Sequence, residues 1–518
     1  MALDNNFWLT YSISEEDLDS IYNFLLETER PLDKFSITRF LIERTIQEQK
    51  ALQKAKQLSG GQQYIPSKQY KKGDTLVFPQ LEWKSGKVVS TRPGKNPEFP
   101  ELEVIDVMMA TKETISFAAN LSEHKLNAPI VETDDPLLDA DFVVSKFGSA
   151  LAEKITTVLS QSKDLVCIAR QYFPRALVVD IGIGHLNLCE AVLEMAEGGP
   201  LSTAELIKQV ELPTDVNAHL TEFSLNLALQ EDGRFDEVGP SGVTLWFLKR
   251  LEPAEVQAPP VTLRYTGEIE DLSTIGADGD LAALDVCDEL EPSMVCEPAD
   301  SISISLSYPH WRAGTLPLTN QLRDLFPTAY ETPRVKFNFK DGNSGEVFSG
   351  WVVRPSKYIY GLRDWYERMG TIPGSIVTIT RSKTPGEVTI QTTRNKNSKD
   401  WIRTVLIGAD GGIVFALLKQ VISCTFDDRM AIMVTDIDAM DTVWSNTSKQ
   451  RQQIEKIVLN VMRELGKLNP QGQIHAQELY AAVNVIKRTP PSVILKTLYT
   501  QPWAKHLGDL YFRLDESN

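Results

Sequence analysis

One order of secondary-structure signals returns along this chain, and it restricts the fold more than any other feature. Residues 24–42 and 191–210 each show a helical pattern, a break that contains Pro-Leu, and a second helical pattern. Residues 219–251 then add a third helix and two strands around Gly-Pro-Ser-Gly. Residues 450–514 repeat the plan, with three helices and a hairpin that turns at Gly508–Asp509. Because 518 residues exceed a single core, we expect several small modules.

Three helices followed by a two-stranded wing resemble the winged-helix domain, a helix-turn-helix variant. The resemblance implies that the third helix enters the major groove and that the wing contacts phosphates, which would place Lys496 and Lys505 at DNA. The module at 187–250 carries acids where a DNA reader should be basic, so we expect protein partners there; these acids are Glu222, Glu231, Asp232, Asp236 and Glu237. The mildly basic module at 447–518 fits DNA and protein partners equally well.

The charges are segregated along the chain. The net charge of −17 argues against nucleic acid, but residues 251–304 hold thirteen Asp or Glu against one Arg and so account for −12. Residues 305–400 follow with fourteen Lys or Arg against eight acids, a net charge of +6. We expect an acidic linker with little core, which would shield the basic module or repel wrong partners.

Residues 310–379 carry the most informative pattern of the basic module. Its glycine, aromatic and aliphatic positions are Gly314, Leu316, Leu318, Phe326–Pro327, Phe337, Phe339, Asp341, Gly345, Trp351, Tyr358, Gly361, Trp365–Tyr366, Gly374 and Val377. This pattern resembles the DNA-binding pseudobarrel of plant auxin-response transcription factors, a fold shared with effector domains of some bacterial restriction endonucleases. The resemblance covers about 70 of 518 residues, and Ser375 stands where that family usually has Asp, which affects a turn more than a DNA contact.

In that family two loops contact the major groove of DNA. The resemblance implies DNA contacts in the two corresponding segments of this chain, called here the first and second arm. The first arm would hold Arg312, Thr315, Thr319, Asn320 and Arg323, and the second would hold Arg354, Ser356 and Lys357. Arg suits guanine, Asn suits adenine, and Thr and Lys suit phosphates. Four cations of 394–403 either extend the phosphate footprint or lie in a solvated loop; they are Arg394, Lys396, Lys399 and Arg403. The basic face as a whole could also be merely solvated.

Signals of catalysis or cofactor binding are weak, so no cofactor and no metal are expected. The segment with Gly182 and Gly184 lacks the third glycine of a dinucleotide-binding loop and the acidic residue that follows such a loop. Five aspartates between 427 and 441 lack the nearby Glu-x-Lys of a nuclease, and the six histidines lack zinc-ligand spacing. A nucleophile triad stays open, because its members need not be close in sequence.

Together these signals predict an α+β multidomain protein. We expect an N-terminal helical domain (1–58), an SH3-like β-barrel (64–112), a helical and winged-helix region (145–250), the acidic linker (251–304), the DNA-binding pseudobarrel (305–400), a β-rich segment (401–446) and a C-terminal winged-helix domain (447–518). No signal peptide or membrane span is expected, and five scattered cysteines without CxxC suit a reducing cytoplasm, with nucleoid association compatible.

The expected function is double-stranded DNA binding without chemistry, in transcription regulation or genome defence. Two alternatives stay open: a restriction-type nuclease with a catalytic domain hidden in 100–190, and a protein-interaction scaffold.

Overall fold

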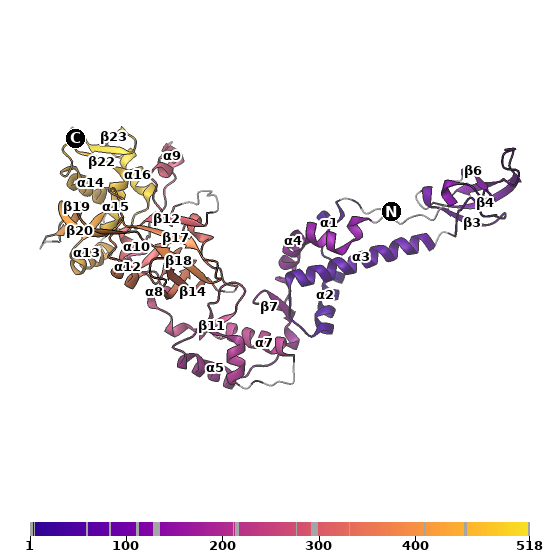
Figure 1. The fold of residues 1–518 in the computed structure, drawn as a ribbon, viewed down its shortest axis with the longest axis horizontal. Coiled ribbons are helices and arrows are strands. Elements are labelled where there is room, and N and C mark those ends of the chain that lie inside the picture. The colour runs from indigo at the N-terminus through magenta and orange to yellow at the C-terminus, as the bar shows by residue number, and fades with distance from the viewer. Residues whose placement is uncertain are drawn as a thin grey trace. The chain divides into compact units, whose positions relative to one another are not determined.

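The structure, a computed structural model, describes residues 4, 6–58, 61–81, 84–109, 113–127, 135–210, 212, 217–275, 277–291, 299–330, 332–408, 411–449 and 453–515. The chain divides into two compact units, residues 1–179 with 214–223 and residues 180–213 with 224–518. The described strands form six separate sheets, accompanied by helices, so the architecture is α+β and multidomain as predicted (Figure 1). Among the described residues, no helix has both the length and the apolar character that crossing a bilayer requires.

The first unit begins with a helical module. Its elements are α1 (Phe7–Thr10), α2 (Glu15–Thr28), β1 (Leu32–Asp33), α3 (Lys34–Leu58), α4 (Ala140–Leu159), β7 (Leu165–Ile168) and β8 (Gln171–Pro174). A capping box begins helix α2: Ser14 accepts from the backbone N–H of Asp17, and the Asp17 carboxylate accepts from Ser14 in return. The three short strands form one sheet in the order β1-β8-β7.

A five-stranded mixed sheet lies between α3 and α4 in the sequence. Its strands are β2 (Gln62–Gln63), β3 (Thr75–Phe78), β4 (Lys84–Pro93), β5 (Glu103–Met109) and β6 (Thr114–Ala119), in consecutive order. Leu76, Phe78, Val88, Ile105 and Val107 belong to its buried core. The strand-rich region expected at 64–112 therefore extends to Ala119 and is an insertion within the first module, not a domain that follows it.

The second and third modules repeat one element order. The second has α5 (Ile183–Met195), β9 (Leu201–Ser202), α6 (Thr203–Val210), α7 (Ala218–Glu231), β10 (Phe235–Glu237) and β11 (Leu245–Leu248). The third has α14 (Ile454–Gly466), β22 (Gln473–His475), α15 (Ala476–Ile486), α16 (Pro491–Thr500), β23 (Ala504–Gly508) and β24 (Tyr511–Leu514). The order helix, strand, helix, helix, strand, strand also describes the first module from α2 onward, once its insertion is set aside.

The three small sheets share their register as well as their order. In each, the last strand lies in the middle and pairs with both others. The middle strand places a buried aromatic opposite an aliphatic residue of the first strand; the pairs are Leu32 with Tyr172, Leu201 with Trp246, and Ile474 with Phe512. These cross-strand pairs close each core from the sheet side.

Seven strands make the largest sheet. They are β12 (Ser301–Ser305), β13 (Thr315–Pro317), β14 (Arg334–Asp341), β15 (Val347–Val353), β16 (Tyr358–Tyr360), β17 (Ile376–Arg381) and β18 (Glu387–Gln391), in the order β12-β17-β18-β14-β15-β16-β13. Only β14 and β18 pair in parallel. The helices α10 (Tyr308–Ala313), α11 (Asn320–Arg323) and α12 (Arg363–Met369) accompany this sheet, and Trp365 and Tyr366 of α12 lie in its core.

A long hairpin follows the large sheet. Strands β19 (Arg394–Ile407) and β20 (Ile413–Cys424) pair along most of their length, and β21 (Ile432–Val434) joins β19 in parallel. Helix α13 (Ile437–Lys449) leads to the third module.

The acidic segment is folded, which corrects the expectation of a linker with little core. It contains α8 (Ala254–Gln257), α9 (Asp278–Ala283) and single-turn 3₁₀ helices, and it buries Leu263, Leu272 and Leu284. Its C-terminal end already belongs to the large sheet as β12. The acidic composition predicted a linker because unpaired acids are not buried. Acids that find cationic or hydroxyl partners can be buried, and the sequence alone does not reveal those partners.

The second helix of each module begins directly after the first strand, and a side chain caps it there. Asp33 accepts from the N–H of Phe35 and Ser36, and Ser202 accepts from the N–H of Glu205. In the third module the cap is His475, whose Nδ1 accepts from the N–H of Gln477 at 3.2 Å. Only a neutral imidazole can accept this bond. Burial, and after it the charge of Arg429, lowers the pKa of His475 to about 4.

The His475 cap should make the stability of this unit depend on pH. Between pH 6.5, the pKa of an unfolded histidine, and pH 4, the unfolded chain binds a proton that the folded chain does not, so the free energy of unfolding falls as pH falls through this window. His475→Asn keeps a capping acceptor but does not titrate. Urea unfolding at pH 7 and pH 5 should show a loss that is smaller in the variant by roughly 1–2 kcal/mol. Equal losses would contradict the neutral cap.

Candidate nucleic-acid interface

Two loops at one end of the large sheet lie beside each other. They are the segment after β13, which includes α11, and the turn 354–357 between β15 and β16. The N–H of Leu318 donates to the carbonyl of Lys357 at 2.8 Å, and Arg354 Nη2 donates to the carbonyl of Pro327 at 2.9 Å. Lys357 has a φ of 53°, the left-handed conformation that lets the chain reverse in this turn. The structure thus joins the two loops in which the sequence placed the DNA contacts.

The polar residues of these loops differ in their exposure and in their contacts with the rest of the protein. Arg323 is 57% exposed at the side chain and pairs with the neighbouring Asp324 at 3.6 Å. Arg354 is half-buried, and burial followed by the charge of Arg323 lowers its pKa. Lys357 is exposed, with Nζ 3.3 Å from the carbonyl of Glu289. Arg354 therefore holds the loop, whereas Arg323 and Lys357 are exposed cations, of which Lys357 also donates to the carbonyl of Glu289.

Hydroxyl and amide groups lie next to these cations. Asn320, the first residue of α11, and Ser356, within the turn, are both half-buried. Thr319 Oγ1 lies 3.4 Å from the Sγ of Cys287. Burial raises the pKa of that thiol to about 12, so Cys287 stays protonated and is not an activated nucleophile.

Two residues of the predicted first arm lie elsewhere. Arg312 makes two bonds to the carboxylate of Asp441 on α13, one of them 3.0 Å from Nε to Oδ1. Thr315 is fully buried and contacts His310. Both residue types suit DNA contacts. Arg312 is instead bound to an acid 129 residues away in the sequence. Thr315 is buried, so neither side chain lies at the surface of the two loops.

The remaining predicted contacts are scattered. Arg394 donates to the carbonyl of Arg368 at 3.0 Å. Lys396 lies on β19, and its side chain is outside the described residues. Lys505 is exposed on β23. None of these three has a described contact with the loops that hold Arg323 and Lys357.

The acidic segment covers helix α16, the third helix of the C-terminal module. Lys496 forms an ion pair with Glu270, and Tyr499 donates to Asp280 at 2.6 Å. The N–H of Ser492 donates to Glu291 at 2.7 Å. Most side chains of α16 are buried. The winged-helix resemblance implies that this helix enters the major groove of DNA. In the structure, its surface is instead bound by carboxylates of the same chain.

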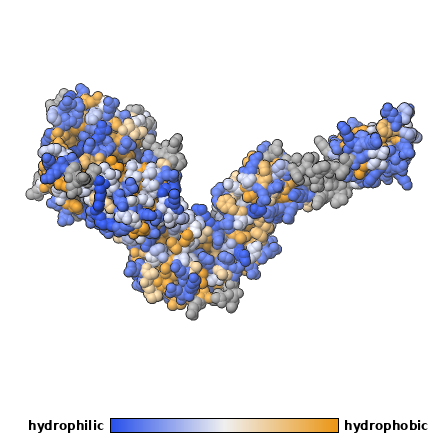
Figure 2. Space-filling view, viewed as in Figure 1, coloured by the Kyte–Doolittle hydropathy of each residue, from blue (hydrophilic) through white to orange (hydrophobic). Residues whose placement is uncertain are grey.

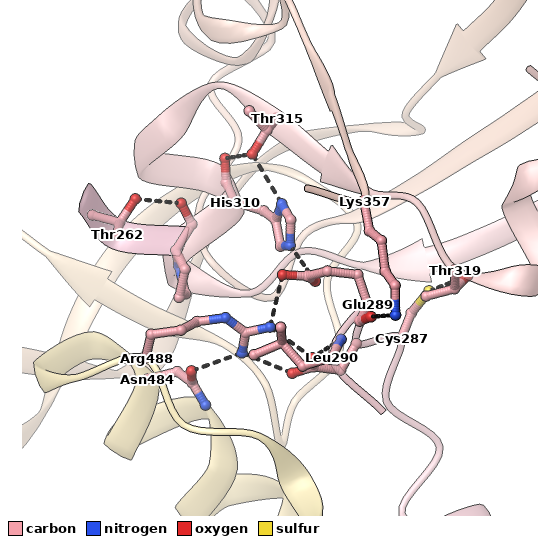
Figure 3. A network of polar contacts seen from close by, with 12 residues as sticks. Thr262, Cys287, Glu289, Leu290, His310, Thr315, Thr319, Lys357, Asn484 and Arg488 are labelled. Atoms are coloured by element: carbon pink, nitrogen blue, oxygen red, sulfur yellow. Dashed lines mark hydrogen bonds and ion pairs between the residues drawn. The ribbon is translucent and has the colours of Figure 1, made fainter. Parts of the chain in front are cut away.

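A buried ionic network fixes the acidic segment between the large sheet and the C-terminal module (Figure 3). Arg488 donates from Nη2 to Asp288 at 2.6 Å and to Glu289 at 2.9 Å, and from Nη1 to the second oxygen of Asp288 at 2.7 Å. Tyr480 donates to Asp288 at 2.7 Å. Arg488, Asp288 and Glu289 are each at most 2% exposed at the side chain. Sequence reasoning missed this network, because 200 residues separate Arg488 from Asp288.

The same network contains a hydroxyl, an imidazole and a carboxylate in series. Thr315 Oγ1 lies 2.9 Å from His310 Nδ1, and His310 Nε2 lies 2.8 Å from Glu289 (Figure 3). Burial alone would raise the pKa of Glu289, but the charges of Arg488 and His310 outweigh it and hold that pKa below its ordinary value. All three residues are buried, so no substrate reaches Thr315, and Arg488 already neutralises the carboxylate. The series is a structural contact and not a catalytic triad.

Three of the five aspartates between 427 and 441 have described side-chain contacts. Asp427 accepts from the N–H of Arg429 and Met430, Asp436 accepts from the N–H of Ala439 at the start of α13, and Asp441 binds Arg312. Within the described residues, no group of three His, Cys, Asp or Glu side chains is placed to hold a metal ion.

Comparison of the chain with protein-family models, with curated proteins and with solved structures gave no match. The resemblances to the pseudobarrel and to winged-helix domains stay predictions. The function of the chain is therefore inferred from the contacts, exposure and charge of its own residues.

Removing Arg488 should be strongly destabilising, because the buried Asp288 would lose its counter-charge and the buried Glu289 would keep only its contact with His310. We expect Arg488→Met to lower the free energy of unfolding by about 3–5 kcal/mol in urea titrations. Adding Asp288→Asn and Glu289→Gln should restore part of the loss. Arg381→Ala breaks an exposed pair with Asp300 and should cost less than about 1 kcal/mol. Equal costs for Arg488 and Arg381 would show that the network does not hold the segment.

Proposed function

We propose that this chain binds double-stranded DNA without chemistry of its own, through the two loops that hold Arg323 and Lys357. The observation that supports this proposal is that two loops separated in sequence lie side by side and hold these two exposed cations. We interpret the seven-stranded sheet as the pseudobarrel that the sequence indicated, the three repeated modules as winged helices, and the inserted sheet as an SH3-like barrel.

The chemistry of the loops suits a duplex. Arg323 has the planar fork that pairs with guanine in the major groove, Asn320 can pair with adenine, and Lys357 is placed for a phosphate. Arg354 contributes by fixing the loop through the carbonyls of Phe326 and Pro327. Since residues 305–400 carry +6 in a chain of −17, electrostatics favours this face over the rest of the surface.

The C-terminal module serves assembly in this proposal. Its third helix is paired with the acidic segment, so it holds that segment in place instead of reading DNA. Such a protein would act in transcription control or genome defence by recognising DNA and positioning partners. The nuclease alternative gains no support, because the described carboxylates form no metal cluster.

Arg323→Ala and Lys357→Ala should each weaken binding to a mixed-sequence duplex. Removing one phosphate contact lowers the slope of log K against log salt by about 1, and removing a base contact costs roughly 1–3 kcal/mol. Fluorescence anisotropy of a labelled duplex across about 50–300 mM salt measures both effects on the full chain.

Lys496→Ala is the matched control, because Glu270 already neutralises Lys496 on α16. We expect its duplex affinity and salt slope to equal those of the unchanged chain. If Lys496→Ala weakened binding while Arg323→Ala and Lys357→Ala did not, the C-terminal module would be the reader and the proposed interface would fail.

A second candidate function, protein interaction through helix α5, is favoured by one observation. Leu188 and Met195 are 51% and 77% exposed, and together with Gly184 and Ala191 they form one helical face at the spacing i, i+4, i+7, i+11. Figure 2 shows apolar side chains on the surface of this part of the chain. We infer a second copy of the chain as the occupant. In an antiparallel pair of α5 helices, Met195 meets Gly184 and Leu188 meets Ala191, so a large side chain faces a small one at each level.

Sedimentation velocity over a concentration series tests this pairing. The unchanged chain should form dimers as concentration rises, and Met195→Glu should remain monomeric because it buries a charge at the helix contact. Val243→Glu, at an exposed position in the loop between β10 and β11, should still dimerise. An unchanged chain that stays monomeric at all concentrations would refute the pairing.

A further inference from the structure

The β19–β20 hairpin exposes an aromatic and basic surface that the duplex interface does not use. Trp401 is 66% exposed and lies directly opposite Lys419 in the antiparallel register. Lys399, two residues before Trp401 on the same strand, projects from the same face and lies opposite Val421. Val421 is itself 52% exposed. A large apolar ring this exposed is unusual on a monomer surface.

The cations beside Trp401 are available, whereas the cation further along the strand is not. Lys399 and Lys419 are exposed, and no described ion pair engages either of them. Arg403 is different: it pairs with Glu478 at 3.0 Å and donates to the carbonyls of Ala431 and Asp428. Asp400 lies between Lys399 and Trp401 in sequence, so it projects from the opposite face. The ribbon face around Trp401 therefore carries positive charge without an acid of its own.

A cavity of about 340 Å³ opens beside Trp401. Its walls include Trp401, Leu417, Leu465, Leu468, Asn469 and Pro470. Its lining combines apolar side chains with the amide groups of Asn469 and Gln473. The side chains of Asp428 and Glu478 also line it; Arg403 pairs with the Glu478 carboxylate and donates to the backbone carbonyl of Asp428. The cavity is large enough for one planar heterocyclic ring inserted next to the indole.

We propose that this surface binds single-stranded nucleic acid, with one base stacked on Trp401 and its flanking phosphates at Lys399 and Lys419. Aromatic rings that stack on bases, set in a groove of positive charge, are how single strands are held without a sequence requirement. An acidic peptide would satisfy the lysines but not the flat exposed indole beside a ring-sized cavity. Paired bases in a duplex are stacked on one another and cannot cover Trp401, so this site is separate from the duplex interface and goes beyond it.

Binding of fluorescein-labelled dT15 and U15 to the full chain, followed by anisotropy at about 50–200 mM salt, tests the site. We expect Trp401→Ala to weaken binding about 5- to 150-fold and Trp401→Phe to retain most of the affinity. Lys399→Ala and Lys419→Ala should each reduce the salt dependence of binding. Oligonucleotide should also quench part of the tryptophan fluorescence, and Trp401→Phe should remove that quenching.

Leu406→Ala is the matched control, since Leu406 is 42% exposed on the opposite face of β19. It should bind dT15 and U15 like the unchanged chain. Binding unaffected by Trp401→Ala, or no binding of either oligonucleotide at the lowest salt, would overturn the proposal and point to a protein partner for this face. The duplex experiments with Arg323→Ala and Lys357→Ala are independent of this one, so either interface can fail while the other stands.

Discussion

The second unit depends on a buried ion pair between Arg488 and the neighbouring carboxylates of Asp288 and Glu289. Taking these charges out of water is costly, and only mutual pairing with satisfied hydrogen bonds offsets the cost. Both carboxylates and the guanidinium find partners in one arrangement, in which the acidic segment lies between the large sheet and the C-terminal module. The network therefore specifies position more than it adds net stability.

That arrangement decides how charge is used on the surface. The acidic segment directs Glu270, Asp280 and Glu291 to helix α16, so the third helix of the C-terminal module is covered. The loops with Arg323 and Lys357 and the hairpin with Trp401 keep exposed cations. The two surfaces proposed for nucleic acid, one suited to a duplex and one to an unpaired base, have no described contact with Glu270, Asp280 or Glu291, the carboxylates that cover α16.

Much of the local structure could be predicted. Ser14 caps α2 through Asp17, three residues along the chain, and Trp365 and Tyr366, two positions of the pattern at 310–379, lie in the core of the large sheet. The two loops expected to act together do lie together. Arg312 and Thr315 could not be assigned correctly, because the partner of Arg312, Asp441, and the burial of Thr315 come only with the tertiary fold. The first module was not recognised from the sequence because a five-stranded sheet separates its helices α3 and α4.

The sequence by itself determined the elements that depend on neighbouring residues: helix starts, turns, strand alternation and the repeated order of helices and strands. It also determined which residues are cationic. Only the tertiary structure decided which cations stay free, because ion pairing joins groups as distant as Arg488 and Asp288, and local composition carries no record of such contacts. For the same reason the acidic segment is a packed layer and not a linker: its carboxylates are buried only where folding brings partners to them.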